Sequence, residues 1–158
     1  MAVAELNEDF RDFFECLEHE HVEYVVVGAH ALAWHGLPRA TGDIDVLVRP
    51  TDENAHRVVA ALLRFGAPLA DHGVTQVDFA TSGNVYQIGL PPRRIDLLTE
   101  LTGVATDDVF STRVTARVGA LTLPFIGRRG LLDNKRATAR PKDLADVIEL
   151  ERLEHPAR

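Results

Sequence analysis

The segment of residues 24–49, YVVVGAHALAWHGLPRATGDIDVLVR, constrains the fold more than any other part of the chain. Its apolar run at 25–27 (VVV) ends at Gly28, and such a run is typical of a buried strand. Apolar residues then recur at helical spacing until residues 36–38 (GLP) end the pattern. A second alternating run begins after Gly42. The segment therefore predicts a strand, a glycine junction, a short helix and a second strand.

The second predicted strand carries a pair of acids. Asp43 and Asp45 flank Ile44, and side chains alternate across a strand, so both acids point to the same face. Two neighbouring carboxylates repel each other unless a proton or a cation lies between them. Hard oxygen ligands suit Mg²⁺, which takes phosphate oxygens in its other positions. The pair favours a magnesium site; the alternative is a half-buried strand with two solvated acids.

The glycine junction and its neighbours carry features that attract phosphate. A helix that opens directly after Gly28 presents free backbone N–H groups, which bind phosphate oxygens. His30 is a candidate ligand of a phosphate or a base, or else a histidine packed near the turn. The planar fork of Arg39 fits a triphosphate. Its alternative role is a salt bridge with Asp43 or Asp45.

A third acid, Asp96, lies in a later apolar strand predicted over residues 93–98. It alternates with its aliphatic neighbours as Asp45 does in the earlier strand. If the two strands are adjacent, three carboxylates converge. Phosphoryl-type transfer uses such a set, because two acids hold metal on the triphosphate and a third serves a second metal or accepts a proton.

Two charged residues near the C-terminus are further candidates. Lys135 shares the inward face of a helix predicted over 127–139, where it reaches a triphosphate or extends its charged head into solvent. At about 100° per residue, Asp143 projects inward from the last helix, whereas Asp146 lies further toward solvent. Asp143 pairs with Lys135 or Lys142, binds substrate, or is a favourable carboxylate in a helix's first turn.

The remaining segments are interpreted as scaffold. Apolar periodicity predicts further helices over residues 5–20 and 51–66 and from Pro141 onward. The inward-facing apolar arc predicted for the last of these consists of Leu144, Val147, Ile148 and Leu150. Turn residues between apolar runs predict two hairpins, one with strands 76–80 and 85–90 and one with strands 112–118 and 121–125. We expect one domain, 1–158, with a helical C-terminal segment at about 127–154.

Composition narrows the class of protein. The net charge of −7 disfavours a generally basic nucleic-acid surface, although basic residues in the C-terminal half permit a local polyanion site. Cys16 is the only cysteine, so a disulfide framework or a zinc cluster is not expected. The acidic N-terminus lacks the apolar stretch of a signal peptide, and no apolar run is long enough for a bilayer. We therefore expect a cytoplasmic protein with no membrane partner.

The pattern G-A-H-A-L-A-x-H-G-x-x-R-x-T-G-D-I-D-V resembles the minimal nucleotidyltransferases of the polymerase-β superfamily, in particular the branch that includes the AbiEii-type toxins of bacterial toxin–antitoxin systems. That branch has a Gly-Gly or Gly-Ser turn, here Gly28-Ala29, and an Arg-x-Thr-x-Asp-x-Asp strand, here residues 39–45. It also has a third acid, which Asp96 matches, and a C-terminal Lys…Lys-Asp segment, which residues 135–143 match.

The resemblance implies an α/β (α+β) fold with a small mixed, mostly antiparallel sheet flanked by helices. It implies transfer of a nucleoside monophosphate from a nucleoside triphosphate to an acceptor hydroxyl with Mg²⁺ or Mn²⁺, the acceptor being tRNA and an antitoxin protein being a partner. The implied catalytic and metal-binding residues are Asp43, Asp45 and Asp96. The implied nucleotide-binding residues are Gly28, Ala29, His30, Arg39, Thr41, Lys135 and Asp143.

Two alternatives belong to other functional classes. Ala29 stands where the branch has a second glycine or a serine, so its methyl group hinders close approach of a phosphate and supplies no hydroxyl. This favours a non-catalytic nucleotide- or RNA-binding protein that keeps the fold. The second alternative is a subunit that needs a partner for the acceptor, because the chain has little room for a separate substrate domain.

Overall fold

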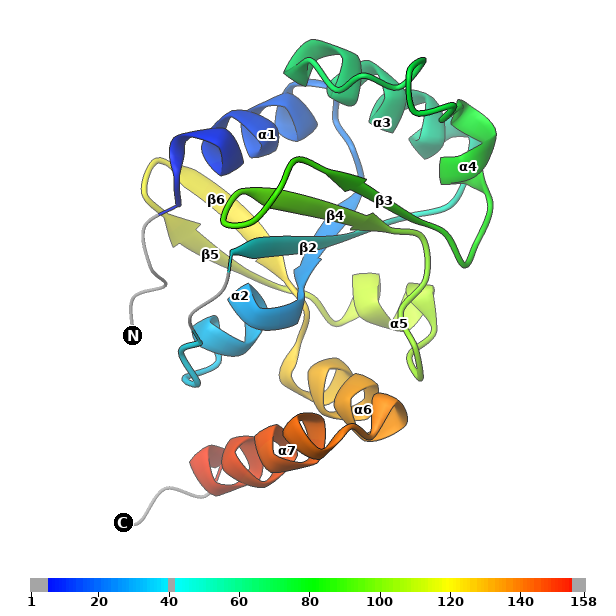
Figure 1. Cartoon of the computed structure of the whole chain (residues 1–158). Helices are drawn as coiled ribbons and strands as arrows, with labels where there is room; N and C mark the ends of the chain where they lie inside the picture. The colour runs from blue at the N-terminus through cyan, green and yellow to red at the C-terminus, as the bar shows by residue number, and fades with distance from the viewer. Residues whose placement is uncertain (1–5, 40–41, 155–158) are drawn as a thin grey trace.

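The computed structural model describes residues 6–39 and 42–154, which form one six-stranded sheet with helices on both faces (Figure 1). The elements in chain order are α1 (Glu8–His19), β1 (Tyr24–Val27), α2 (Gly28–Trp34), β2 (Asp43–Val48), α3 (Asp52–Phe65), α4 (Gln76–Ala80), β3 (Val85–Ile88), β4 (Arg94–Leu98), α5 (Thr106–Ser111), β5 (Val114–Val118), β6 (Leu121–Phe125), α6 (Arg128–Thr138) and α7 (Pro141–Glu154).

The strand order is β3-β4-β2-β1-β6-β5. The pairs β2/β4 and β1/β6 are parallel, and the other three pairs are antiparallel. The expected mixed, mostly antiparallel sheet flanked by helices is thus confirmed. None of the described helices has the length and apolar character needed to cross a bilayer.

The two faces of the sheet have different neighbours. Helices α1, α3 and α4 lie over one face, and α2, α5 and α6 lie on the other (Figure 1). On the α1 side, Tyr24 packs against Phe14 with ring centroids 5.7 Å apart. Ile44 and Val46 of β2 are buried in the core, and the alternate residues Asp43 and Asp45 point to the α2 side. The sheet thus separates an apolar layer from the layer that holds the acids.

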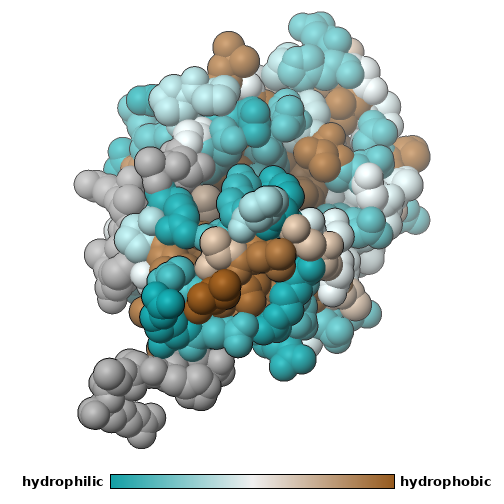
Figure 2. Space-filling view, turned by 60° about the horizontal axis from the view of Figure 1, so that its bottom comes forward, coloured by the Kyte–Doolittle hydropathy of each residue, from teal (hydrophilic) through white to brown (hydrophobic). Residues whose placement is uncertain are grey.

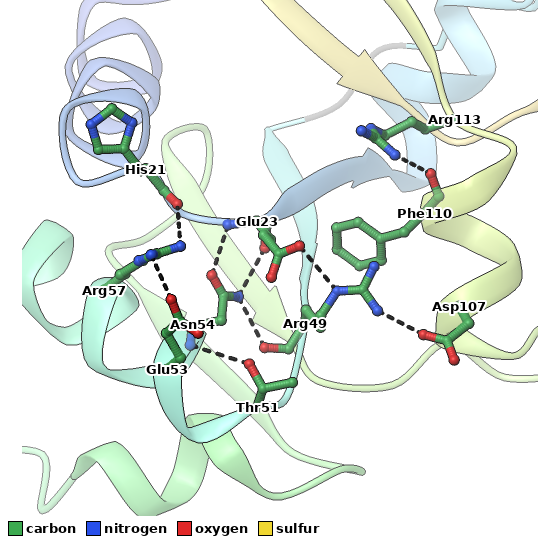
Figure 3. A network of polar contacts seen from close by, with 10 residues as sticks. All are labelled: His21, Glu23, Arg49, Thr51, Glu53, Asn54, Arg57, Asp107, Phe110 and Arg113. Atoms are coloured by element: carbon green, nitrogen blue, oxygen red, sulfur yellow. Dashed lines mark hydrogen bonds and ion pairs between the residues drawn. The ribbon is translucent and has the colours of Figure 1, made fainter.

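A buried asparagine joins the start of β1 to the end of β2 (Figure 3). Asn54 of α3 has no exposed surface. Its Oδ1 accepts from the Glu23 N–H at 2.7 Å, and its Nδ2 donates to the carbonyls of Glu23 at 3.0 Å and Arg49 at 2.9 Å. These bonds join the residue before β1 to the residue after β2. They therefore support the register that sets Val27 opposite Asp45.

Arg49 extends the same network to α5 (Figure 3). Its guanidinium carbon lies 4.2 Å from the centre of the Phe110 ring, a cation–π geometry. The same side chain pairs with Glu23 at 3.3 Å and with Asp107 at 2.6 Å. The helix α5 is in this way tied to the residues that flank the ends of the central strands β1 and β2.

One predicted hairpin is wrong. Residues 76–80 form the helix α4 and not a strand, because a capping box closes its first turn. The Thr75 side chain accepts from the N3 backbone, and Asp78 Oδ2 accepts from the Thr75 N–H at 2.8 Å. The strand β3 pairs with β4 instead. The second predicted hairpin is confirmed as β5 and β6, with Gly119 at φ +62° in its turn.

The last helix buries two acids beside two of its apolar residues, Val147 and Leu150. Leu144 and Ile148, predicted to face inward, are 44% and 58% exposed, whereas Asp143 and Asp146 are buried. The prediction that Asp146 lies toward solvent is therefore wrong. Val147 is buried as predicted. Figure 2, which brings the α7 side of the molecule forward, shows an apolar patch surrounded by hydrophilic residues. The helix α7 is oriented by its buried charges, whose partners are described below.

Candidate active site

Three acids lie on one face of two adjacent strands. The strands β2 and β4 run parallel, and their register sets Asp45 opposite Asp96 and Asp43 opposite Arg94. Directly opposite residues in a sheet have neighbouring side chains on the same face. The condition on which the predicted carboxylate cluster depended, adjacency of the two strands, is therefore met.

Gly28 forms the wall behind this cluster. It has φ +70°, a left-handed conformation that favours glycine. A Cβ on Gly28 would lie 2.2 Å from Oδ2 of Asp45, which is closer than non-bonded atoms approach. The carboxylate of Asp45 thus rests against the first turn of α2. The glycine is needed here both for the turn and for the approach of an acid to the backbone.

Crowding changes the electrostatics of the cluster. The pKa of Asp45 is raised from 3.8 to about 7. The largest cause is burial, followed by the charge of Asp96, a hydrogen bond between the Asp45 and Asp96 side chains, and the charge of Asp43; Arg94 acts in the opposite direction. Asp45 therefore keeps its proton to a much higher pH than an ordinary aspartic acid does in the metal-free protein.

Arg94 is a member of the cluster that sequence reasoning missed. Its Nη2 donates to Asp43 Oδ2 at 2.7 Å and to Asp96 Oδ2 at 3.2 Å, and its Nε donates to Asp96 Oδ1 at 3.0 Å. One signal for it exists in the sequence, because residues two apart on a strand share a face and Arg94 precedes Asp96 by two. The cationic partner of Asp43 is thus Arg94, and the predicted salt bridge of Arg39 with Asp43 or Asp45 is wrong.

Arg39 instead reaches the C-terminal helix. It forms an ion pair with Asp146 of α7, which is distant in the sequence. On the other side of Asp146, Lys135 Nζ lies 3.1 Å from Oδ2. Because Asp146 is only 6% exposed, its charge needs these two cations. This is the physical reason why α7 turns its acids inward.

Asp143 completes the buried charge cluster. Its carboxylate accepts from Arg140 Nε at 2.6 Å and from Thr138 Oγ1 at 2.8 Å, and it lies 3.5 Å from Lys135 Nζ. The hydrogen bond from Arg140 is the largest of several causes that hold the pKa of Asp143 well below its ordinary value. Of its two predicted partners, Lys135 is the one in contact. The charged head of Lys135 is not extended into solvent, because its side chain is 13% exposed and pairs with both acids.

His30 and Ala29 lie at the junction, in the first turn of α2. The His30 ring meets Phe10 edge to face, with centroids 5.9 Å apart. Burial lowers the pKa of His30, and a hydrogen bond with the Asp43 backbone opposes this change. Its Nδ1 is buried and has no hydrogen-bond partner among the described residues. Ala29 is half-buried. Thr41, the remaining predicted nucleotide ligand, lies outside the described residues.

The donor set fits a hard divalent cation in its chemistry. Within residues 6–39 and 42–154, no three His, Cys, Asp or Glu side chains form a ready-made metal cage. The three acids nevertheless supply crowded carboxylate oxygens, and they already draw the guanidinium of Arg94 between Asp43 and Asp96. A cation that took these oxygens would relieve the repulsion that raises the pKa of Asp45.

Two solved structures share the fold of this chain. A Thermotoga maritima protein provisionally named a nucleotidyltransferase superposes with a TM-score of 0.56 and 15% identity, over 96% of this chain and 94% of that one. The fold is that of a nucleotidyltransferase. An antigenic nucleotidyltransferase-like protein from Paracoccidioides brasiliensis has a TM-score of 0.54 and 14% identity, over 94% of this chain and 77% of that one. The sequence matches no family model and no curated protein. At these identities the nucleotidyltransferase likeness establishes the fold alone.

Proposed function

We propose that this protein is a metal-dependent nucleotidyltransferase that moves a nucleoside monophosphate from a nucleoside triphosphate to an acceptor hydroxyl. The observation that carries the proposal is the in-register pair of Asp45 and Asp96 with Asp43 beside it, next to the glycine junction of a nucleotidyltransferase fold. Crowded acids of this kind destabilise the folded protein, because like charges raise each other's pKa. Such clusters are therefore typical of functional sites.

In this proposal the three acids have different roles. Asp43 and Asp45 hold a divalent cation, Mg²⁺ or Mn²⁺, and Asp96 contributes to a second metal site. When bound, the metal neutralises charge on the triphosphate. The acceptor oxygen attacks the α-phosphorus, the bond from that phosphorus to the bridging oxygen breaks, and pyrophosphate leaves. The hydroxyl proton passes to Asp96, whose carboxylate lies in register with Asp45 on the neighbouring strand.

The phosphates are assigned to the junction and to the cations around it. Backbone N–H groups that follow Gly28, those of Ala29 and His30, are proposed to donate to phosphate oxygens. Arg39, Lys135 and His30 are proposed to neutralise the triphosphate, and Thr41 is proposed as a further nucleotide-binding residue. Arginine and lysine carry more N–H donors than a single carboxylate contact uses.

The acid of the last helix has a supporting part in this scheme. Asp143 restricts the position of Lys135, because its carboxylate lies 3.5 Å from Lys135 Nζ and both side chains are largely buried. A lysine fixed in this way presents its remaining donors in one direction. We assign Asp143 to the nucleotide site through this contact.

The acceptor and the biological role are proposed from the motif alone. By its resemblance to the AbiEii-type branch, the acceptor is the end of a tRNA, and the protein is a cytoplasmic toxin held by an antitoxin protein. The exposed aliphatic side chains of α7, Leu144 and Ile148, support the presence of a protein partner. The same surface supports the alternative in which a partner subunit supplies the acceptor.

A non-catalytic nucleotide- or RNA-binding protein is the second candidate, and Ala29 favours it. The residue before it, Gly28, has no room for a methyl group on the side of Asp45. Ala29 places a methyl group in the next position of the same turn. In that case the protein binds a nucleotide but does not transfer its nucleoside monophosphate.

One experiment separates these functions. The protein is incubated with each α-labelled nucleoside triphosphate, Mg²⁺ and total RNA, and transfer of label is followed on gels. We expect transfer by the wild type and none by Asp43→Asn or Asp45→Asn, both folded by circular dichroism. The exposed Asp71→Asn is the matched control and should keep full transfer. Full turnover by Asp45→Asn would exclude the metal assignment, and nucleotide binding without transfer would favour the non-catalytic candidate.

A further inference from the structure

Arg94 lies among the carboxylates, at the position where a divalent cation would bind in a metal site. Arg94 stands opposite Asp43 in the register of β2 and β4, and it shares a face with Asp96 on its own strand. Its neighbour Arg93 pairs with Asp9 of α1 at 3.0 Å. Two adjacent arginines thus have different partners, and only Arg94 contacts the cluster.

The contacts of Arg94 use the same oxygen atoms that a cation would need. One nitrogen, Nη2, bonds both Asp43 Oδ2 and Asp96 Oδ2, and Nε bonds Asp96 Oδ1. A guanidinium fork that bonds two carboxylates holds them strongly and in one orientation. Both Asp96 oxygens and one Asp43 oxygen are therefore engaged by protein. In keeping with this arrangement, the acids among the described residues form no ready-made metal cage.

We propose that Arg94 is an internal counter-cation, which stabilises the metal-free cluster and must leave Asp43 and Asp96 before a divalent cation binds them. The inference rests on the proposed metal-dependent function. The side chain of Arg94 is 29% exposed, so it has a route into solvent. A bound triphosphate would offer it new oxygens, because guanidinium fits phosphate as well as carboxylate. Arg94 would in this way make metal binding depend on the presence of the nucleotide.

The test measures Mn²⁺ binding by electron paramagnetic resonance, without any turnover. We compare the wild type, Arg94→Gln and the matched control Arg93→Gln, which removes the same charge one residue away. In the absence of nucleotide, Arg94→Gln should bind Mn²⁺ about tenfold more tightly than the wild type, an ordinary size for coupling between two ligands. Arg93→Gln should bind as the wild type does. A nucleoside triphosphate should tighten Mn²⁺ binding more in the wild type than in Arg94→Gln.

Melting curves give a second readout. In chelator, Arg94→Gln should melt below Arg93→Gln, because Asp43 and Asp96 lose their bonds to the guanidinium, and Mn²⁺ should raise its melting temperature more than that of the wild type. Where Arg94→Gln does not fold, Arg94→Lys keeps the charge but loses the fork, and it should still bind Mn²⁺ more tightly than the wild type.

The outcomes that overturn the inference are distinct from those that overturn the proposed function. Equal or weaker Mn²⁺ binding by Arg94→Gln, with binding abolished by Asp45→Asn, would refute the counter-cation role and leave the metal site standing. Equal melting of Arg94→Gln and Arg93→Gln in chelator would refute it as well. No Mn²⁺ binding by any folded variant would overturn the metal assignment and this inference together.

Discussion

Replacing Asp45 by asparagine should stabilise the metal-free protein, and the gain should grow with pH. The pKa of Asp45 rises from 3.8 to about 7 on folding. At about 1.36 kcal/mol per pH unit, ionising this group in the folded state costs roughly 4 kcal/mol. This is an upper value, because the residue is half-buried and water screens part of the charge. Asparagine has no charge to lose and keeps a donor for Asp96.

The sign follows from proton binding. Between pH 3.8 and about 7 the folded state binds the Asp45 proton more tightly than the unfolded state does. The stability contributed by this proton is complete below the unfolded pKa and is lost as the pH rises through the folded pKa. The wild type should therefore lose stability relative to Asp45→Asn over this window, with no further change above it.

The assay is urea unfolding in chelator at pH 5, 6, 7 and 8. Asp45→Asn should exceed the wild type by a margin that grows to roughly 4 kcal/mol at pH 8. Asp43→Asn is the control of opposite sign, because it removes a carboxylate held by Arg94 at 2.7 Å and should lower stability. Added Mg²⁺ should shrink or reverse the advantage of Asp45→Asn, since it binds the wild type better. A margin that is absent at pH 8, or that does not change with pH, would refute the crowded cluster.

Three further substitutions test other parts of the structure. Gly28→Ala should destabilise by about 3 kcal/mol or more, whereas Gly66→Ala, also at positive φ but with no atom within 4 Å, should cost only the backbone strain; equal losses in urea unfolding would contradict the contact with the acid. Asn54→Ala should cost about 3 kcal/mol, because it leaves buried backbone groups unpaired, and Asn134→Ala, which removes one solvent-exposed hydrogen bond to the Thr102 carbonyl, should cost under about 1 kcal/mol; a small effect of the first would show that the ends of β1 and β2 are held otherwise. Lys135→Ala should weaken triphosphate binding in calorimetric titration and also lower the melting temperature, because two buried acids lose a cation; unchanged affinity would remove it from the nucleotide site.

The acids could be predicted because local rules govern them. Strand alternation alone sets Asp43 and Asp45 on one face, and the same alternation around Asp96 needed only adjacency of two strands to bring all three together. The glycine junction was predictable for a similar reason, since Gly28 ends an apolar run. What the pattern did not contain was the contact of Gly28 with Asp45, which depends on the register of β1 and β2.

The failures share a different cause, which is competition between local patterns and contacts elsewhere. Residues 76–80 alternate like a strand, but the cap formed by Thr75 and Asp78 decides in favour of a helix. The apolar pattern of α7 predicted that Asp146 faces solvent, yet Arg39 and a lysine on α6 draw it inward. No spacing rule connects residues that are 107 positions apart.

That long connection gives the site an order of assembly in time. A chain is synthesised from its N-terminus at about 5–20 residues per second. Arg39 and Asp146 are 107 positions apart, so about 5–20 s pass between the appearance of Arg39 and that of its partner. In the second half of this interval the strands that carry the acids, β2 and β4, are already made, but the helix that holds Arg39 and Lys135 is not. A nascent chain would therefore carry the carboxylates before the cations that we propose to bind phosphate are held in place, and docking of α7 would be the event that completes the proposed site.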